Sequence, residues 1–133
     1  MALAKDRLTP RREVTAYDIG VATTKTLYAG GIACLNASGY ATPGATATGL
    51  KALGISVQKV ANPGADGAVS VRIERGCYRF KNSASSDAIA VTDIGATAYI
   101  VDDETVAKTN GSSTRSAAGI IRDVDAQGVW IEF

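Results

Sequence analysis

The sequence predicts an all-β fold: a small β-barrel or sandwich of short strands with an extended N-terminal arm. Apolar and polar residues alternate at a period of two, most regularly over residues 69–74, which is typical of a strand with one buried face. Candidate strands recur about every ten residues with Gly-rich turns between them, as in small barrels and sandwiches. Residues 50–53 suggest at most one helical turn, since Gly49 and Gly54 bracket them closely.

Residues 1–16 are predicted to form the arm and residues 17–133 a single β domain, because 133 residues suffice for one core but not for two. Pro10 disfavours a continuous helix in the arm. Fully extended, the arm would span about 50–58 Å at ~3.3–3.6 Å per residue, enough to contact a neighbouring subunit or an underlying surface. A floppy terminus explains the same composition equally well. The candidate contact residues of the arm are Lys5, Arg7, Leu8, Arg11 and Arg12.

Several short strands are expected in the first half of the domain. Two of them lie within residues 18–40 and are broken at Gly30 and Gly31. Residues 36–49 are rich in Gly, Ala, Ser and Thr, a composition compatible with either a loop or an edge element. Residues 55–61 predict a strand that ends in the turn-rich segment 62–67.

In the second half, the regular strand of residues 69–74 is interrupted at Gly76, which indicates a bulge or a close backbone approach before residues 77–80. A turn over residues 81–87 is expected next. The remaining predicted elements are strands near 88–92 and 97–102, a short strand at 105–107, a polar loop at 108–116, and a terminal hairpin of residues 117–122 and 128–133 across residues 123–127.

The terminal strand carries two aromatic residues, Trp130 and Phe133, at an odd spacing. Side chains alternate along a strand, so one ring is expected in the core and the other on the outer face. Aromatic residues are enriched at the centres of interfaces, which makes Trp130 and Phe133 candidate contacts with a partner. Packing within the monomer explains them equally well.

Seven short segments of the second part of the chain form a recognisable ordered pattern: GISV (54–57), NPGADG (62–67), RGCYRF (75–80), GA (95–96), YIVDDETV (99–106), AGII (118–121) and GVWI (128–131). Through these segments, roughly residues 50–133 resemble the head decoration, or cement, proteins of tailed bacteriophages, particularly of Mu-like phages. The resemblance implies a virion structural protein on the capsid exterior that binds the major capsid protein. It also implies homo-oligomers, with trimers favoured, that bridge capsid subunits.

Composition and charge limit the classes of partner that the chain is expected to bind. Hydrophobic residues make up 46% of the chain, but many are alanine and only 6% are aromatic, so stability is expected to lean on oligomerisation or partners. A net charge of +1 provides no field for a polyanion, so no nucleic-acid partner is expected. No apolar run has signal-peptide or membrane-spanning length, which predicts no membrane partner and synthesis in the host cytoplasm.

Cys34 and Cys77 are expected to be buried free thiols, although a disulfide between them remains open.

The chain contains no histidine, so the usual general base and the commonest metal ligand are missing. No enzyme activity, cofactor or metal is therefore predicted. The run of Asp102, Asp103 and Glu104 is better explained by a solvated turn than by a cation site, because the EF-hand spacing is missing. Asp123 and Asp125 are similarly explained by a hairpin loop.

Two other classes of protein stay open as alternatives to a decoration protein. A phage tail or baseplate β module would share the strand pattern but would tend to form rings or tubes. A carbohydrate-binding module would normally present several exposed aromatic side chains, whereas this chain has one Trp. Small residues such as Ala118 are expected to pack against neighbouring subunits.

Overall fold

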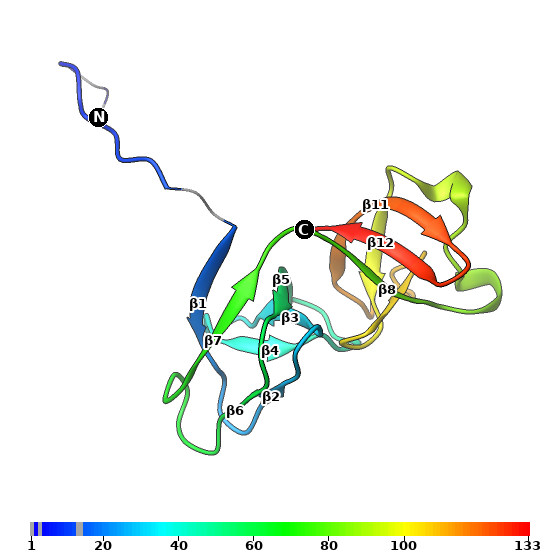
Figure 1. Ribbon diagram of the computed structural model, residues 1–133, viewed down its shortest axis with the longest axis horizontal. Helices are drawn as coiled ribbons and strands as arrows, with labels where there is room; N and C mark the ends of the chain where they lie inside the picture. The colour runs from blue at the N-terminus through cyan, green and yellow to red at the C-terminus, as the bar shows by residue number, and fades with distance from the viewer. Residues whose placement is uncertain (1, 3, 13–14) are drawn as a thin grey trace.

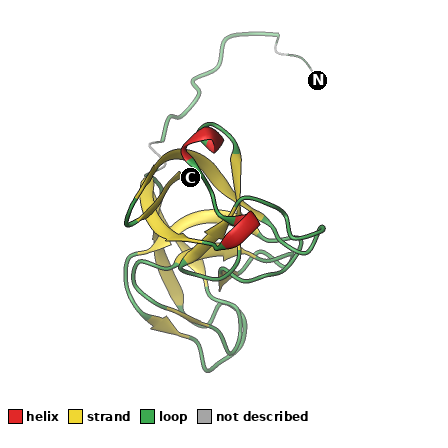
Figure 2. Ribbon diagram, turned by 90° about the vertical axis from the view of Figure 1, so that its right-hand side faces the viewer, coloured by secondary structure: helices red, strands yellow, loops and turns green. Residues whose placement is uncertain are grey.

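The computed structural model describes residues 2, 4–12 and 15–133 and confirms the all-β prediction (Figure 1). A five-stranded sheet lies next to a closed five-stranded barrel, and a two-stranded ribbon completes the fold. The described residues include two single-turn 3₁₀ helices, η1 (Ser85–Asp87) and η2 (Val91–Asp93), which Figure 2 shows among the strands.

The five-stranded sheet is antiparallel, and each of its strands is short. A bridge between Val21 and Ala41 connects the end of its first strand to its last, with Ala22 N donating to Ala41 O at 2.9 Å. The sheet therefore curls around its own apolar face. Its strands, in spatial order, are β1 (Ala16–Gly20), β7 (Ser70–Glu74), β5 (Lys51–Ser56), β3 (Ile32–Leu35) and β4 (Ala41–Pro43), and the ribbon consists of β2 (Thr26–Leu27) and β6 (Val60–Ala61).

The barrel is mixed, because one of its strand pairs, β10 with β8, is parallel. Its long terminal hairpin turns at Ala126 and Gln127, so the first hairpin strand extends further than the sequence predicted. In spatial order the barrel strands are β10 (Thr105–Ala107), β8 (Cys77–Asn82), β12 (Gly128–Glu132), β11 (Ala117–Asp125) and β9 (Thr97–Ile100).

The chain passes from the sheet to the barrel at Gly76, which separates β7 from β8 (Figure 1). The alternation in β7 is as predicted: Val71 and Ile73 are fully buried, while their neighbours are exposed. The Gly76 interruption thus marks the end of one sheet and the start of the next.

Two hydrophobic cores fill the molecule. The barrel core is centred on Ile100, Ile121 and Ile131, and the sheet core on Leu27 and Ile73. Strand β3 contributes to both cores, because alternate side chains of a strand point to opposite faces. The β3 residues of the barrel core are Ile32 and Cys34, and that of the sheet core is Ala33.

Two predicted strands differ from the structure. The strand expected over residues 55–61 is broken, because residues 57–59 separate the end of β5 from β6. The strand expected near 88–92 is wrong: residues 88–90 form no strand and residues 91–93 form η2. The side chain of Asn82 takes the place of a strand partner here, since its Nδ2 donates to Ile89 O and its Oδ1 accepts from Ile89 N, both at 2.8 Å. The Asp93 carboxylate accepts from Ala90 N at 2.8 Å and closes the turn. Local side-chain hydrogen bonds of this kind compete with strand pairing.

Residues 51–53 are strand and not a helical turn, which corrects that expectation. Residues 41–43 form the edge strand β4, one of the two structures expected within residues 36–49. The two cysteines differ from each other. Cys34 is buried as predicted, but Cys77 is exposed, because it lies on the outward side of β8, and both are free thiols. Ala118 is 7% exposed and belongs to the barrel core, so it is not a surface on which neighbouring subunits pack.

Candidate functional site

Residues 4–12 of the arm are exposed, have no helix or strand, and run away from the body of the molecule (Figure 1). Leu8 is 95% exposed. A hollow of about 580 Å³ is lined by arm residues alone and therefore offers no preformed site. A smaller hollow of about 280 Å³ lies where Arg12 approaches Tyr17, Asp18 and Ile19 of β1.

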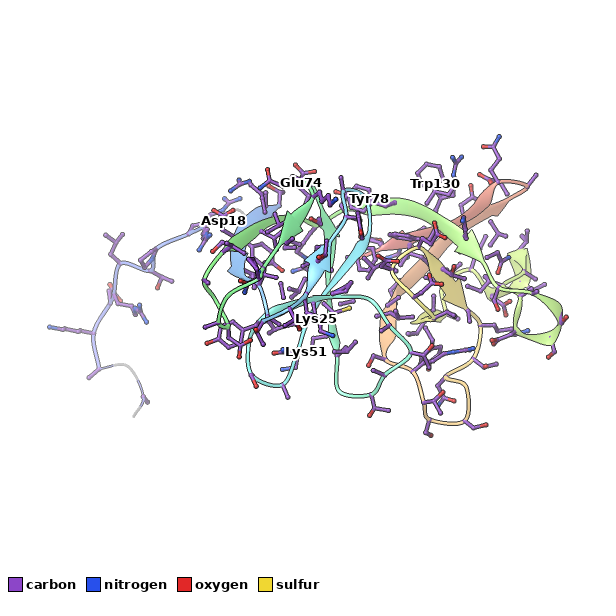
Figure 3. The ribbon with its side chains drawn as sticks, turned by 90° about the horizontal axis from the view of Figure 1, so that it is seen from below. Asp18, Lys25, Lys51, Glu74, Tyr78 and Trp130 are labelled. Carbon is purple, nitrogen blue, oxygen red and sulfur yellow. The ribbon has the colours of Figure 1, made fainter. Side chains whose placement is uncertain are left out.

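The seven predicted contact residues do not form one site. Five are on the arm, beyond the free edge of β1, whereas Trp130 and Phe133 come from the terminal strand of the barrel. Figure 3 shows Trp130 well separated from Asp18, which marks β1 at the base of the arm. Any partner that contacts both groups must extend over the two sheets.

The two aromatic residues lie on opposite faces, as their spacing predicts. Phe133 packs against the barrel core, with its ring 5.7 Å from that of Phe80 at an interplanar angle of 90°. Trp130 is half-buried on the outer face, paired across the strands with Arg79. Phe133 is thus a packing residue, and Trp130 is the outward aromatic.

Trp130 is held by polar contacts on both sides. The Arg79 guanidinium lies over the indole, 5.8 Å from the ring centroid, at a distance typical of a cation–π contact. Trp130 Nε1 donates to Asp125 Oδ2 at 3.0 Å, and Arg79 donates to Gln127 Oε1 at 2.6 Å. These four residues, Arg79, Asp125, Gln127 and Trp130, are the Trp130 cluster, and they fix the ring on the barrel surface.

The β11–β12 turn supports this cluster. Asp125 Oδ1 accepts from Gln127 N at 2.7 Å and from Gly128 N at 3.0 Å. The Trp130 hydrogen bond first, and then these backbone donors and Arg79, lower the pKa of Asp125. The turn explanation of Asp123 and Asp125 is therefore supported for Asp125, whose carboxylate is engaged within the hairpin.

A third hollow, of about 330 Å³, lies where the β2–β3 turn meets the β9–β10 turn, and it is called the Tyr28 hollow below. Its two walls are joined by a hydrogen bond from Ile32 N to Asp103 O of 2.8 Å. Sequence reasoning missed it, because its walls are more than 70 residues apart and no motif links them. It is lined by Tyr28, Ala29, Gly30, Gly31, Asp103 and Glu104.

The acidic run at this hollow is a turn in which the three carboxylates differ. Asp102 Oδ1 accepts from Glu104 N at 2.9 Å, and Glu104 pairs with Lys81 at 2.7 Å. Burial, followed by the charges of Asp102 and Glu104, raises the pKa of Asp103. Within residues 2, 4–12 and 15–133, no group of three or more His, Cys, Asp or Glu side chains is placed to hold a metal ion.

No helix in the described part of the chain combines the length and the apolar character needed to cross a membrane. Comparisons of the chain with protein families, with curated proteins and with solved structures find no match. The candidate contact sites of the described residues are therefore the arm, the Trp130 cluster and the Tyr28 hollow.

Proposed function

We propose that this protein is a structural protein of a phage virion, a capsid decoration protein that binds the major capsid protein on the outer surface of the head and stabilises the lattice. The proposed form is a homo-oligomer, with a trimer favoured. The proposal includes no enzyme activity and no nucleic-acid or membrane partner. It builds on the resemblance of residues 50–133 to head decoration proteins.

The observation that carries the proposal is the exposed arm joined to a sheet edge. Residues 4–12 project from the body, and β1, which follows, is the first strand of its sheet, where residues 16–20 pair with β7 alone among the described strands. A cement protein needs contacts to several subunits at once rather than a reaction centre. Linked weak contacts raise the effective concentration for each further contact, and an arm that orders on docking provides one of them.

The Trp130 cluster supports the same proposal as a second contact surface. Its indole is fixed by Arg79 and Asp125 before any partner binds, so little side-chain entropy is lost on association. Trp and Arg are the residue types that most often dominate binding energy at interfaces. A rigid patch and an extended arm on different sheets suit a protein that bridges subunits.

The first test is the mass of the purified protein in solution by light scattering, followed by co-sedimentation with undecorated phage heads. A compact oligomer that pellets with heads and saturates supports the proposal. A monomer or an open-ended tube that stays in the supernatant contradicts it and favours the tail-module or carbohydrate-module alternatives.

A truncation tests the arm directly. It should remove residues 1–14 and keep Thr15, because the Thr15 carbonyl accepts a 2.8 Å hydrogen bond from Arg75 N. The expected product is folded and binds heads poorly. A matched control replaces Lys5, Arg7, Arg11 and Arg12 with Gln in the full chain, which separates the charge of the arm from its length. Full occupancy of heads by the truncated protein would refute the role of the arm.

A further inference from the structure

The Tyr28 hollow has the size of a site for one small group. Its volume of about 330 Å³ lies at the lower end of the ~300–1,000 Å³ typical of small-ligand sites. Its walls come from separate sheets and are joined by the Ile32 N to Asp103 O hydrogen bond. The hollow is therefore part of the folded frame, formed where the sheet and the barrel meet.

One carboxylate of the hollow lacks a counter-charge. Glu104 is paired with Lys81, and Asp102 caps the turn through its contact with Glu104 N. Asp103, in contrast, makes no ion pair with any described residue. Its raised pKa reflects the same situation, since a partly buried carboxylate beside two like charges is costly to ionise without a cation.

An aromatic ring lies at the same place. Tyr28 is 55% exposed, and Lys59 Nζ lies 5.2 Å from its ring centroid. The ring thus already contacts the Lys59 ammonium, and the exposed part of Tyr28 remains accessible to another group. A tyrosine ring beside an uncompensated carboxylate is suited to a guanidinium, which stacks on aromatic faces and forms charge-assisted hydrogen bonds with carboxylates.

The arm supplies the complementary charge. Residues 1–13 contain four basic and two acidic residues, whereas the rest of the chain contains 10 basic and 11 acidic residues. The described arm residues are exposed and extended, so their side chains are presented to other molecules. A second copy of this chain therefore carries, on its arm, the positive charge that is complementary to Asp103.

We propose that the Tyr28 hollow binds an arginine or lysine side chain from the N-terminal arm of a second copy of this chain, with the cation between the Asp103 carboxylate and the Tyr28 ring. This inference rests on the proposed function only in treating the arm as a contact element. It names the subunit contact that would hold the oligomer together in the absence of a capsid.

The test is disulfide trapping between two full-length chains of different tag size. Both chains carry Cys77→Ser, because Cys77 is exposed, while the buried Cys34 is kept. One chain carries Leu8→Cys on the arm and the other Ala29→Cys on the wall of the hollow. Mild oxidation is expected to give the mixed disulfide, and raising NaCl from about 0.05 M to about 0.5 M should slow its formation by screening.

Adding Asp103→Asn to the Ala29→Cys chain should lower the rate of the mixed disulfide about twofold to fivefold, the upper part of the range expected for losing one partly exposed ion pair. Tyr28→Leu should act in the same direction. Asp123→Asn, which neutralises an exposed carboxylate on β11, is the matched control and should leave the rate unchanged. Circular dichroism of each variant checks that it is folded.

A mixed disulfide that forms equally well with Asp103→Asn and with wild-type Asp103 would overturn the inference. A further chain carries both Leu8→Cys and Ala29→Cys. A disulfide that forms only within that single chain, and not between two chains, would also overturn it. These experiments contain no capsid. Failure to pellet with phage heads would therefore count against the proposed function alone, and loss of the Asp103 dependence against the hollow alone.

Discussion

Ala33 and Cys34 are neighbours on β3, yet they are buried in different cores: Ala33 in the core of the five-stranded sheet and Cys34 in that of the barrel. Both side chains are fully buried. The strand is therefore a shared wall, and a disturbance on one of its faces is transmitted to the other through the backbone.

This shared wall predicts that the two halves unfold together. Ile32→Ala, at a fully buried β3 position, should lower the free energy of unfolding by about 2–5 kcal/mol, as large-to-small core substitutions do. Trp130 fluorescence reports on the barrel, and far-ultraviolet circular dichroism reports on the strands of both halves. Both probes should show one coincident transition in denaturant. Ile94→Ala, at a 45% exposed position, is the control and should change stability by less than about 0.5 kcal/mol. Two separated transitions would show that the cores are independent.

The two thiols should differ in reactivity. Burial raises the pKa of Cys34 to about 12, whereas Cys77 is exposed. In the native protein a disulfide reagent should therefore modify Cys77 within minutes and Cys34 only on unfolding.

Because the folded-state pKa of Cys34 lies above its ordinary value of 9.0, its contribution to stability is complete below pH 9 and declines as the pH rises toward 12. Cys34→Ala should remove that part of the pH dependence. Fast modification of both thiols in folded protein would contradict the buried position of Cys34.

The polar loop of residues 108–116 is predicted to depend on one ion pair. Arg115 donates to Asp87 at 2.6 Å, with side chains only 16% and 23% exposed, and Thr109 Oγ1 also donates to Asp87 at 2.6 Å. The Thr109 hydroxyl first and then Arg115 lower the pKa of Asp87. This stabilisation is present above the ordinary value of 3.8 and is lost as the pH falls through the lowered pKa.

Asp87→Asn should therefore lower stability at pH 7 by about 1–3 kcal/mol, the usual effect of removing a charged hydrogen-bond partner, and should flatten the acid limb of the stability curve. Thermal melts between pH 2 and 7 measure both effects. Asp66 provides a comparison, because its carboxylate accepts a backbone donor, Thr23 N, and makes no ion pair with any described residue. An unchanged acid limb in Asp87→Asn would show that other carboxylates dominate acid unfolding.

Periodicity predicted the fold class and part of the local structure. The alternation over residues 69–74 gave β7, and the odd spacing of Trp130 and Phe133 gave their opposite faces. These features depend only on the two-residue period of a strand. The strand expected near residue 88 failed because Asn82 and Asp93 take the hydrogen-bonding groups of that segment, a choice set by tertiary contacts and not by periodicity.

The sites were less accessible to sequence reasoning for a similar reason. The Tyr28 hollow joins turns from different sheets, and the partners of Trp130 come from β8 and from the β11–β12 turn. Cys77 has apolar neighbours in sequence, but its parity on β8 places it outside. A pattern within one segment does not reveal which segments meet.

The last prediction concerns Trp130. Trp130→Phe keeps an aromatic ring under Arg79 but removes the N–H that is the main cause of the lowered pKa of Asp125. The pKa of Asp125 should therefore rise toward its ordinary value, which carboxyl ¹³C titration by NMR measures directly. Trp130→Ala should in addition weaken binding to phage heads about tenfold, as expected for losing an interface aromatic, with the Phe variant in between. If head binding is unchanged in Trp130→Ala while the Asp125 pKa rises in both variants, the cluster serves only to hold the hairpin turn, and the capsid contact must lie elsewhere.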